Sequence, residues 1–273
     1  MPDQDPHRAR EIAESFGSDV DRYDRARPRY PEAVVELVLA DSPGQDVLDV
    51  GIGTGIVAGQ FRAAGCRVLG VDVDPRMAEF ARRHGFAAEV AKFEDWDSGD
   101  RQFDAVVAGQ TWHWVDPVAG AAKAARVLRP GGCLAVFWNA DRPETELAEA
   151  FGEVYARVMP DSLVARRWTS PAIVRGHSLA AVNGYSRLAD TTAESIRETG
   201  LFSEPRQARF DWERRYAKED WLDQVPTTGD HQRFPPEQLD ELLAGLGAAI
   251  DAVGGSFTMP YTTLVVGAAR TST

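Results

Sequence analysis

The sequence predicts an α/β protein built around a largely parallel β-sheet. Short apolar runs alternate with helical patterns between residues 46 and 138, which is typical of strands and helices that alternate in such a fold. Two Asp-Pro pairs, at 74–75 and 116–117, each predict the start of a helix, because Asp caps the first turn and Pro fits its first position. The 273 residues are enough for one large domain.

Five strands are expected in the first half of the chain, at 46–50, 67–71, 86–91, 103–108 and 134–138. Residues 141–200 show helical patterns without a strong strand pattern. A strand at 202–212, an amphipathic helix at 236–253 and a strand at 256–268 complete the chain. Only a Gly-Gly turn separates that helix from the last strand, so we expect the last strand to be antiparallel. Residues 1–273 should form a single domain, in which 1–40 form an N-terminal helical cap and 141–200 a helical cover over the substrate.

Composition restricts the partners. The formal net charge is −12, which disfavours binding to a nucleic-acid phosphate backbone. No apolar run reaches about 18 residues and the start lacks an apolar leader, so we expect neither membrane insertion nor export, and a cytoplasmic protein. Cys66 and Cys133 lie in apolar runs and should be buried, reduced thiols. The scattered histidines predict no metal site. The sequence leaves open whether the protein is a monomer or a homodimer.

A glycine loop follows the first predicted strand and opens a helix. Gly51, Gly53 and Gly55 expose backbone at the carboxyl edge of the sheet, where a ligand can approach closely. Asp72 lies 21 residues after Gly51, at the end of the next strand. A carboxylate at that place can accept hydrogen bonds from both ribose hydroxyls of an adenosine group. The sequence therefore predicts an adenosine-containing ligand.

Two further residues distinguish between adenosine cofactors. Dinucleotide folds place Gly or Ala at the sixth position of the loop to receive a pyrophosphate, and this chain has Ile56 there. Asp49, two residues before the loop, disfavours a pyrophosphate but suits a cationic amino-acid group. S-adenosylmethionine carries an ammonium and a sulfonium. Charge therefore favours this cofactor over NAD.

These segments resemble the class I S-adenosylmethionine-dependent methyltransferases. Val47 to Gly55 is similar to their first motif, VDVDPRM at 71–77 to their second, and RVLRPGG at 126–132 to the turn before their fifth strand. Other residues are similar to a small-molecule branch that includes trans-aconitate-methyltransferase-like and methyltransferase type 11-like proteins. They are Phe16, Tyr23, Arg27-Pro28, Tyr30-Pro31, Gln110, His113-Trp114 and Trp138-Asn139.

The resemblance implies a Rossmann-like seven-stranded mixed sheet of order 3-2-1-4-5-7-6, with strand seven antiparallel and a helical cap. It also implies that the three loop glycines line the methionyl part, Asp72 holds the ribose and Val73 packs on the adenine. Where many members have Asp-Ala-Glu, this chain has Lys92-Phe93-Glu94, so the adenine contact would come from Phe93 and from Glu94 or Asp95. Gln110 would face the methionyl carboxylate or the substrate, and Tyr23 would close the cofactor site.

Aromatic residues at 111–114 follow the fourth strand, where the transferred methyl group would point. Trp112 and Trp114 could pack around a sulfonium and an acceptor. His113 could act as a general base for a hydroxyl or a protonated amine, or it could be structural. Arg27 could bind a carboxylate of the cofactor or of an acidic substrate, or form a surface salt bridge. Further candidates for the substrate wall are Tyr30, Tyr185, Trp168, His177 and His231.

The resulting hypothesis is methyl transfer from S-adenosylmethionine to a small-molecule acceptor, at oxygen or nitrogen and including a carboxylate. Such an in-line displacement requires mainly alignment of the reactants and exclusion of water. Three alternatives stay open: an S-adenosylmethionine enzyme of other chemistry, a non-catalytic binding module, and, weakest, an NAD-dependent oxidoreductase. The acceptor itself is not encoded in a motif.

Overall fold

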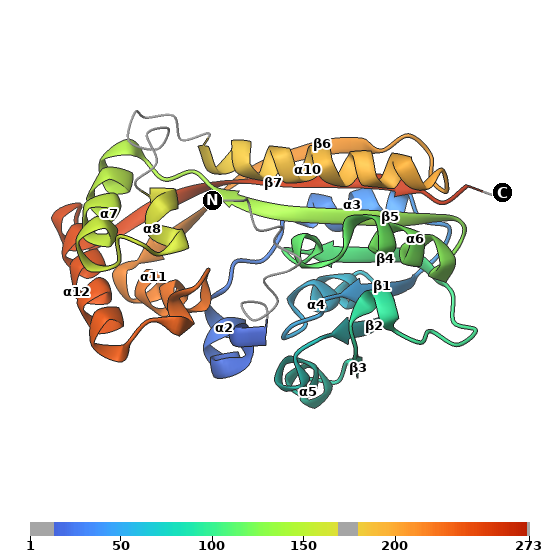
Figure 1. Ribbon diagram of the computed structural model, residues 1–273, viewed down its shortest axis with the longest axis horizontal. Coiled ribbons are helices and arrows are strands. Elements are labelled where there is room, and N and C mark those ends of the chain that lie inside the picture. Colours follow the sequence, from blue (N-terminus) through green and yellow to red (C-terminus); the bar gives the residue numbers. More distant parts are fainter. Residues whose placement is uncertain (1–13, 169–179, 272–273) are drawn as a thin grey trace.

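One seven-stranded sheet organises the computed structural model, which describes residues 14–168 and 180–271 (Figure 1). The strand order is β3-β2-β1-β4-β5-β7-β6. The pairs among β1 to β5 are parallel, and β7 runs antiparallel to both β5 and β6. The predicted sheet order and the antiparallel last strand are therefore confirmed.

The first half of the chain alternates helices and strands as predicted. Its elements are η2 (Glu14–Asp19), α2 (Val20–Ala26), α3 (Glu32–Ala40), β1 (Asp46–Val50), α4 (Ile56–Ala63), β2 (Arg67–Asp72), α5 (Pro75–Arg83), β3 (Ala87–Val90), η3 (Phe93–Asp95), β4 (Phe103–Gly109), η4 (Trp112–Trp114) and α6 (Pro117–Val127). Asp74 and Asp116 cap α5 and α6 through their side chains, which confirms the two predicted helix starts.

The second half has longer strands and a group of helices. Its elements are β5 (Leu128–Asp141), α7 (Thr145–Val158), α8 (Leu163–Trp168), α10 (Ala180–Thr199), β6 (Arg206–Ala217), α11 (Lys218–Gln224), η5 (Val225–Thr227), η6 (His231–Arg233), α12 (Pro236–Ala252) and β7 (Ser256–Ala269).

Helices cover both faces of the sheet. Successive residues of a strand point to opposite faces, so Val47 of β1 packs in a cluster with α3 and α4, whereas Leu48 packs in a cluster with α6 and α10. Both residues are fully buried. The two apolar layers explain why the central strands are almost continuously hydrophobic.

Two strands have bounds that differ from the prediction: β5 is longer, and β6 is shifted along the chain. We expected 134–138, but β5 runs from Leu128 to Asp141 because its backbone continues to pair through the Pro-Gly-Gly segment with the end of β7. We expected 202–212, but β6 runs from Arg206 to Ala217. The charged residues at its end are tolerated because β6 is an edge strand whose side chains alternate between more and less exposed positions. These bounds matter because both strands continue past the carboxyl ends of the parallel strands.

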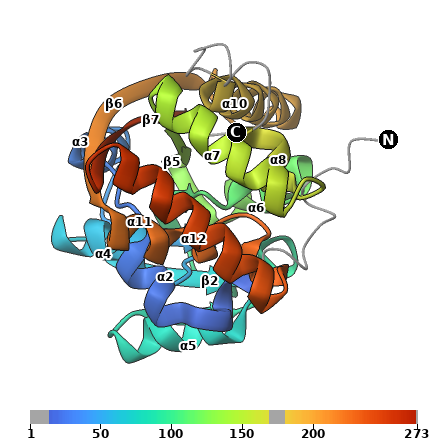
Figure 2. The same ribbon diagram turned by 90° about the vertical axis from the view of Figure 1, so that its left-hand side faces the viewer.

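The extended strands reach a group of helices at one end of the molecule. There α7, α8, α11 and α12 pack around a second apolar cluster (Figures 1 and 2). By contrast α10 packs against α6 and β7 over the sheet. Residues 141–200, expected to form one cover, are thus divided between these two places.

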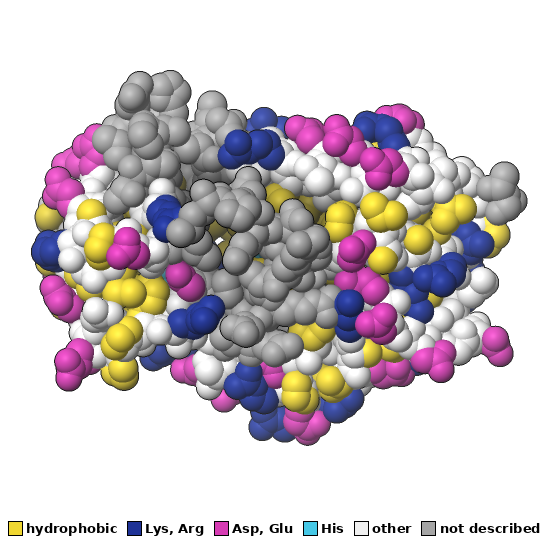
Figure 3. Space-filling view, in the orientation of Figure 1, with side chains coloured by type: hydrophobic (Ala, Val, Ile, Leu, Met, Phe, Trp, Pro, Cys, Tyr) yellow, Lys and Arg dark blue, Asp and Glu magenta, His cyan; other side chains and the backbone are white. Residues whose placement is uncertain are grey.

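The described surface mixes charges of both signs, as the face in Figure 3 shows. No helix in residues 14–168 and 180–271 is long and apolar enough to cross a membrane. Cys66 and Cys133 are buried and unpaired, as expected.

The first helix after the glycine loop gives a test of the fold. Gly55 has φ +95°, and a Cβ there would lie 2.8 Å from Cε2 of Phe86. We expect Gly55→Ala to lower the free energy of unfolding by about 1–2 kcal/mol or more, measured by chemical denaturation. Gly59→Ala is the matched control, because its Cβ would meet Phe86 Cζ at an ordinary 3.8 Å and alanine favours a helix by up to about 1 kcal/mol. Equal effects of the two substitutions would contradict this account.

Candidate functional site

The glycine loop is held against the end of β2 by hydrogen bonds. The Gly51 and Ile52 amides donate to the Val71 carbonyl at 2.7 and 3.2 Å. The Gly53 amide donates to Asp72 Oδ2 at 2.8 Å, and the Asp74 amide donates to Asp72 Oδ1 at 2.9 Å. One carboxylate therefore joins the loop after β1 to the loop after β2.

Gly51 and Gly53 differ in what a side chain at their positions would meet. A Cβ on Gly51, which has φ +71°, would lie 2.2 Å from Thr111 Cγ2, so the loops after β1 and β4 approach closely. Gly53, with φ +55°, has only the Gly51 carbonyl oxygen near its Cβ position, at 4.0 Å. Its backbone is thus open to a ligand. Gly55 differs, because it packs on Phe86 and does not line the cavity described next.

A cavity, here called the loop cavity, opens beside these glycines at the carboxyl edge of β1, β2 and β4. Eight residues predicted for the cofactor site line it: Tyr23, Gly51, Gly53, Asp72, Val73, Phe93, Glu94 and Gln110. Trp114, predicted for the substrate, lines it too. Sequence reasoning missed Met77, although it lies in the quoted second motif, and also Val50, Val71, Ala91, Thr111 and Val115. The cavity is therefore apolar on most sides, with carboxylates at two points.

The acidic residues around the loop cavity differ in their surroundings. Glu94 accepts a hydrogen bond from the Asp116 amide at 2.9 Å, which fixes it at the cavity wall. Lys92 pairs instead with Asp95 at 3.5 Å, where Asp95 is largely exposed. Of the two carboxylates considered for the adenine contact, Glu94 is the one that lines the cavity.

Asp49 lies beneath the loop rather than in the cavity wall. It is 1% exposed, and neither carboxylate oxygen has a hydrogen-bond partner among the described residues. Burial, and after it the nearby charge of Asp72, raise its pKa to about 7. Burial likewise raises the pKa of Asp72 to about 6. The site thus keeps two carboxylates in an environment that disfavours negative charge.

A second cavity, of about 300 Å³, adjoins the loop cavity. The two share Tyr23, Gln110 and Trp114 as a common wall. Arg27, His113, Trp168 and Tyr185, all predicted for the substrate wall or the catalytic step, also line the second cavity. Pro28 and Asn139, which the sequence analysis named only for their family resemblance, also line it. The other lining residues come from the long strands and from the segment that contains α7, α8, α11 and η5, and sequence reasoning missed them: Asp141, Tyr155, Val164, Trp221, Gln224, Val225, Thr228, Gly229, Asp230 and Tyr261.

Gln110 occupies the common wall in a strained conformation. It is the one non-glycine residue in the described chain with positive φ, at +56°. Its amide donates to the Phe137 carbonyl at 2.9 Å, and its Nε2 donates to the Asn139 carbonyl at 3.0 Å. Strain of this kind persists when the surroundings determine it, and it is common at functional sites.

The aromatic residues after β4 separate into two groups. Trp114 lines both cavities, whereas Trp112 is 2% exposed and packs against Phe93 in the core. Trp112 was predicted to touch the substrate, but it lines neither cavity. The sequence did not indicate this difference, because Trp112 and Trp114 are only two residues apart. The short η4 turn directs their side chains to different sides.

His113 lines the second cavity and has a buried partner. Trp138 Nε1 donates to its Nδ1 at 3.3 Å, and the two aromatic rings of His113 and Trp114 lie 4.6 Å apart. Burial lowers the pKa of His113 to about 4. The imidazole is therefore neutral at physiological pH.

Arg27 and Tyr30 follow α2 and approach the glycine loop. Arg27 lines the second cavity and a smaller hollow beside the loop, which Tyr30 and Gly53 also line. Arg27 has no carboxylate partner among the described residues, so the predicted alternative of a surface salt bridge is not observed. Tyr30 packs edge-on against Phe137, with ring centroids 4.8 Å apart.

His231 lies behind the second cavity rather than in its wall. It is fully buried, its Nε2 is 2.8 Å from the Tyr155 hydroxyl, and its Nδ1 contacts the Thr228 carbonyl. It therefore supports Tyr155, which lines the cavity. His177 lies outside the described residues. In residues 14–168 and 180–271 no three His, Cys, Asp or Glu side chains gather as a metal site.

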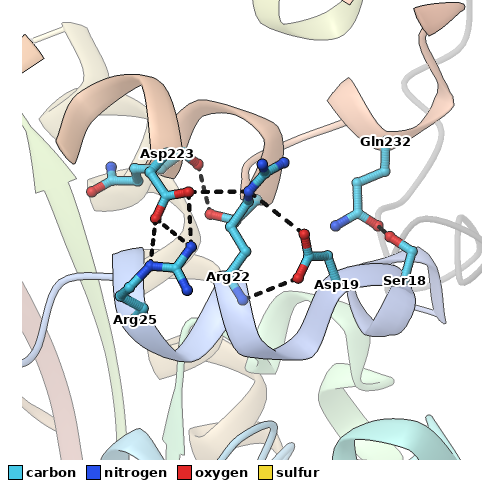
Figure 4. A network of polar contacts seen from close by, with 8 residues as sticks. Ser18, Asp19, Arg22, Arg25, Asp223 and Gln232 are labelled. Atoms are coloured by element: carbon cyan, nitrogen blue, oxygen red, sulfur yellow. Dashed lines mark hydrogen bonds and ion pairs between the residues drawn. The ribbon is translucent and has the colours of Figure 1, made fainter. Parts of the chain in front are cut away.

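Polar contacts hold α2 and the residues just before it against α11 and η6. Arg25 forms two hydrogen bonds to Asp223, at 2.8 and 3.0 Å, and Arg22 forms one at 3.1 Å (Figure 4). Ser18 donates to Gln232 nearby at 2.5 Å. Tyr23 lies on α2 with Arg22 and Arg25, so the contacts of α2 with α11 and of η2 with η6 keep it over the two cavities.

Comparisons with known proteins agree with this geometry. A sequence-family model described as a methyltransferase domain matches residues 48–136. An uncharacterized methyltransferase of Mycobacterium tuberculosis is 36% identical over 150 residues, which are 54% of this chain and 61% of that protein. The chain thus matches less than two thirds of this relative's length.

Solved structures share the fold. A candidate type II methyltransferase from Anaeromyxobacter dehalogenans is similar with a TM-score of 0.58 and 25% identity, over 88% of this chain and 97% of that one. A Haemonchus contortus phosphoethanolamine N-methyltransferase, solved with S-adenosylmethionine, has a TM-score of 0.53 and 14% identity over 99% of this chain and 61% of that one.

The buried carboxylate of Asp49 predicts an unusual pH dependence. Its folded-state pKa of about 7 exceeds the value of about 3.9 for an unfolded chain, so the folded protein binds this proton more tightly. Its contribution to stability therefore falls as the pH rises from about 4 to 7. We expect Asp49→Asn to raise the free energy of unfolding of the ligand-free protein at pH 8 by about 1–3 kcal/mol, and to flatten this slope.

Asp46 on the same strand is the matched control with the opposite sign. Its hydrogen bonds to Arg67 and Arg129 lower its pKa, so its stabilising effect is present at neutral pH and is lost in acid. Asp46→Asn should therefore lower the stability at pH 8. Denaturation curves at several pH values check both variants, and a loss of stability in Asp49→Asn would contradict the assignment.

Proposed function

We propose that this chain, whose residues 48–136 are a methyltransferase domain of the class I S-adenosylmethionine-dependent family, binds S-adenosylmethionine in the loop cavity and transfers its methyl group to a small molecule in the second cavity. The observation that carries this proposal is the common wall of Tyr23, Gln110 and Trp114 between the two cavities. A donor in one cavity and an acceptor in the other would meet there.

The residues of the loop cavity fit this cofactor. Asp72 would accept hydrogen bonds from the ribose hydroxyls, Val73 and Met77 would pack on the adenine, and Glu94 would accept from the adenine amine. The open backbone at Gly53 would receive the methionyl group. The two buried carboxylates favour a cationic ligand, because each lacks a cationic partner among the described residues and its pKa is raised by burial.

The bound cofactor would supply an electrophilic methyl group with its leaving group attached. The protein would align the acceptor with it and exclude water. Tyr23 and Trp114 place aromatic rings at the common wall. Cation–π attraction between such a ring and the sulfonium would be worth about 0.5–2 kcal/mol. Gln110, held by β5, would set the distance between the two ligands.

The size and lining of the second cavity support a small acceptor. Its volume of about 300 Å³ is at the lower end of ligand pockets, about 300–1,000 Å³. Aromatic rings form much of its wall, with Arg27, Asp141 and Asp230 as charged groups. An oxygen or a nitrogen atom of the acceptor would receive the methyl group.

Asp72 gives the direct test of the cofactor site. We expect Asp72→Ala to weaken binding of S-adenosylhomocysteine by about 100-fold or more, because two hydrogen bonds to a charged group are lost. Titration calorimetry measures this, and circular dichroism verifies that the variant is folded. Near-normal affinity in the folded variant would refute the ribose assignment.

The reaction is tested with methyl-labelled S-adenosylmethionine and pools of small metabolites. Transfer of label to one pool, absent with Asp72→Ala, is the expected result. Tight binding of the cofactor without transfer to any pool would favour a non-catalytic binding module instead.

A substitution of Arg27 tests whether this residue binds the carboxylate of the cofactor or a carboxylate of the acceptor. It lies where the glycine loop and the second cavity meet, so Arg27→Gln should weaken the ligand whose carboxylate it binds by about 10- to 100-fold. If S-adenosylhomocysteine binding falls, that ligand is the cofactor; if it is unchanged and KM for the acceptor rises, that ligand is the acceptor. No change in either value would exclude both roles. Arg29→Gln is the control for a lost charge on the same segment, since Arg29 pairs with Asp24 at 3.7 Å and lines neither cavity.

A further inference from the structure

The hydrogen bond between Trp138 and His113 determines which nitrogen of His113 carries the proton. An indole N–H can only donate. Because Trp138 Nε1 donates to Nδ1 of His113, Nδ1 must present its lone pair, and the proton of the neutral ring must lie on Nε2. Trp138 is fully buried in β5, so solvent does not compete for this bond.

We propose that His113 is a positioning residue that donates a fixed hydrogen bond from Nε2 to the acceptor, and that it is not the base of the reaction. This inference rests on the proposed methyl transfer and specifies the acceptor: it presents an oxygen lone pair beside the atom that is methylated. Carboxylates and molecules with a carbonyl next to the reacting atom have such an oxygen.

The surroundings of His113 support a neutral donor. Its ring lines the second cavity, and Nε2 is the ring nitrogen that does not receive the Trp138 hydrogen bond. The charged groups that line the same cavity are Arg27, Asp141 and Asp230. Burial dominates over all of them, lowering the pKa of His113 to about 4.

The role of donor also constrains the chemistry of the transfer. A lone pair of the acceptor forms the new bond to the methyl carbon, and the bond from that carbon to sulfur breaks with its electron pair remaining on sulfur. The sulfonium becomes a neutral thioether. Since Nε2 already holds a proton, His113 takes none from the acceptor. The reacting atom therefore has a free lone pair when it binds, as an ionised oxygen or an uncharged nitrogen does.

The tautomer can be measured without knowing the acceptor. In ¹⁵N-labelled protein, long-range ¹H–¹⁵N spectra distinguish the two neutral forms of each histidine, and His113→Gln assigns the signal. We expect His113 to stay neutral with its proton on Nε2 between about pH 5.5 and 8.

Two other histidines serve as internal controls. His84 Nδ1 lies 2.8 Å from the Phe80 carbonyl and His231 Nδ1 contacts the Thr228 carbonyl, so both should carry the proton on Nδ1. A proton on Nδ1 of His113, or its titration near pH 6.5, would overturn the proposal.

Two substitutions at His113 then separate a donor from a base. The Nε2 amide of Gln can replace the histidine donor but cannot act as a base, and Leu can do neither. With the acceptor identified by the labelling assay, we expect kcat/KM of His113→Gln to stay within about threefold of the wild type and that of His113→Leu to fall about 10- to 100-fold. S-adenosylhomocysteine binding should be unchanged in both variants.

Equal inactivity of the two variants would assign a base and overturn the proposal. Failure of this proposal differs from failure of the proposed function. If the proposed function is wrong, the wild-type protein itself transfers no label.

Discussion

The Asp72 carboxylate is the interaction on which the site depends. It accepts hydrogen bonds from the Gly53 amide of the glycine loop and from the Asp74 amide at the start of α5. A single side chain therefore sets the distance between the loops that follow two adjacent parallel strands. The sheet order reverses direction between β1 and β4, and such a switch point leaves a crevice at the carboxyl ends of the strands. Asp72 borders that crevice, with Asp49 buried behind the loop. Burial makes both charges costly in the empty protein, and a cationic ligand would offset that cost.

The sequence was sufficient to predict the parallel half of the fold, because its strands are short apolar runs and its helices begin at recognisable caps. It also predicted most of the loop cavity, since those residues lie in local motifs at strand ends. Gly55 and Trp112 show the limit of local patterns. Gly55 shares a motif with Gly51 and Gly53, yet it packs on Phe86, 31 residues further along the sequence. Trp112 and Trp114 are two residues apart, yet one is in the core and the other in the cavities. Which of these neighbours faces a ligand is decided by packing partners that no motif contains.

The second cavity was harder to predict because distant segments build it. Because β5 is long, Asn139 and Asp141 lie past the carboxyl ends of the parallel strands. Their antiparallel partners on β7 are Thr263 and Tyr261. Thr263 donates to the Asn139 side chain at 2.6 Å, and the Asn139 carbonyl accepts from Gln110. The strained residue between the cavities is therefore held by the same pairing that extends the sheet. Neither the extension of β5 nor its register with β7 could be inferred from the polar residues themselves.

The two cavities differ in how they would select a ligand. The loop cavity combines the open backbone at Gly53 with the carboxylates of Asp72 and Glu94, a combination that would select for charge and for an adenosine group. The second cavity combines aromatic walls with side chains whose hydrogen-bonding direction is fixed by partners behind them: Trp138 behind His113, and His231 behind Tyr155. Fixed donors and acceptors discriminate between ligands by the cost of leaving one of them unpaired. Selectivity for the acceptor would therefore depend as much on the residues behind the cavity as on those that line it. On the proposed function, this would account for a motif at the donor site and none at the acceptor site.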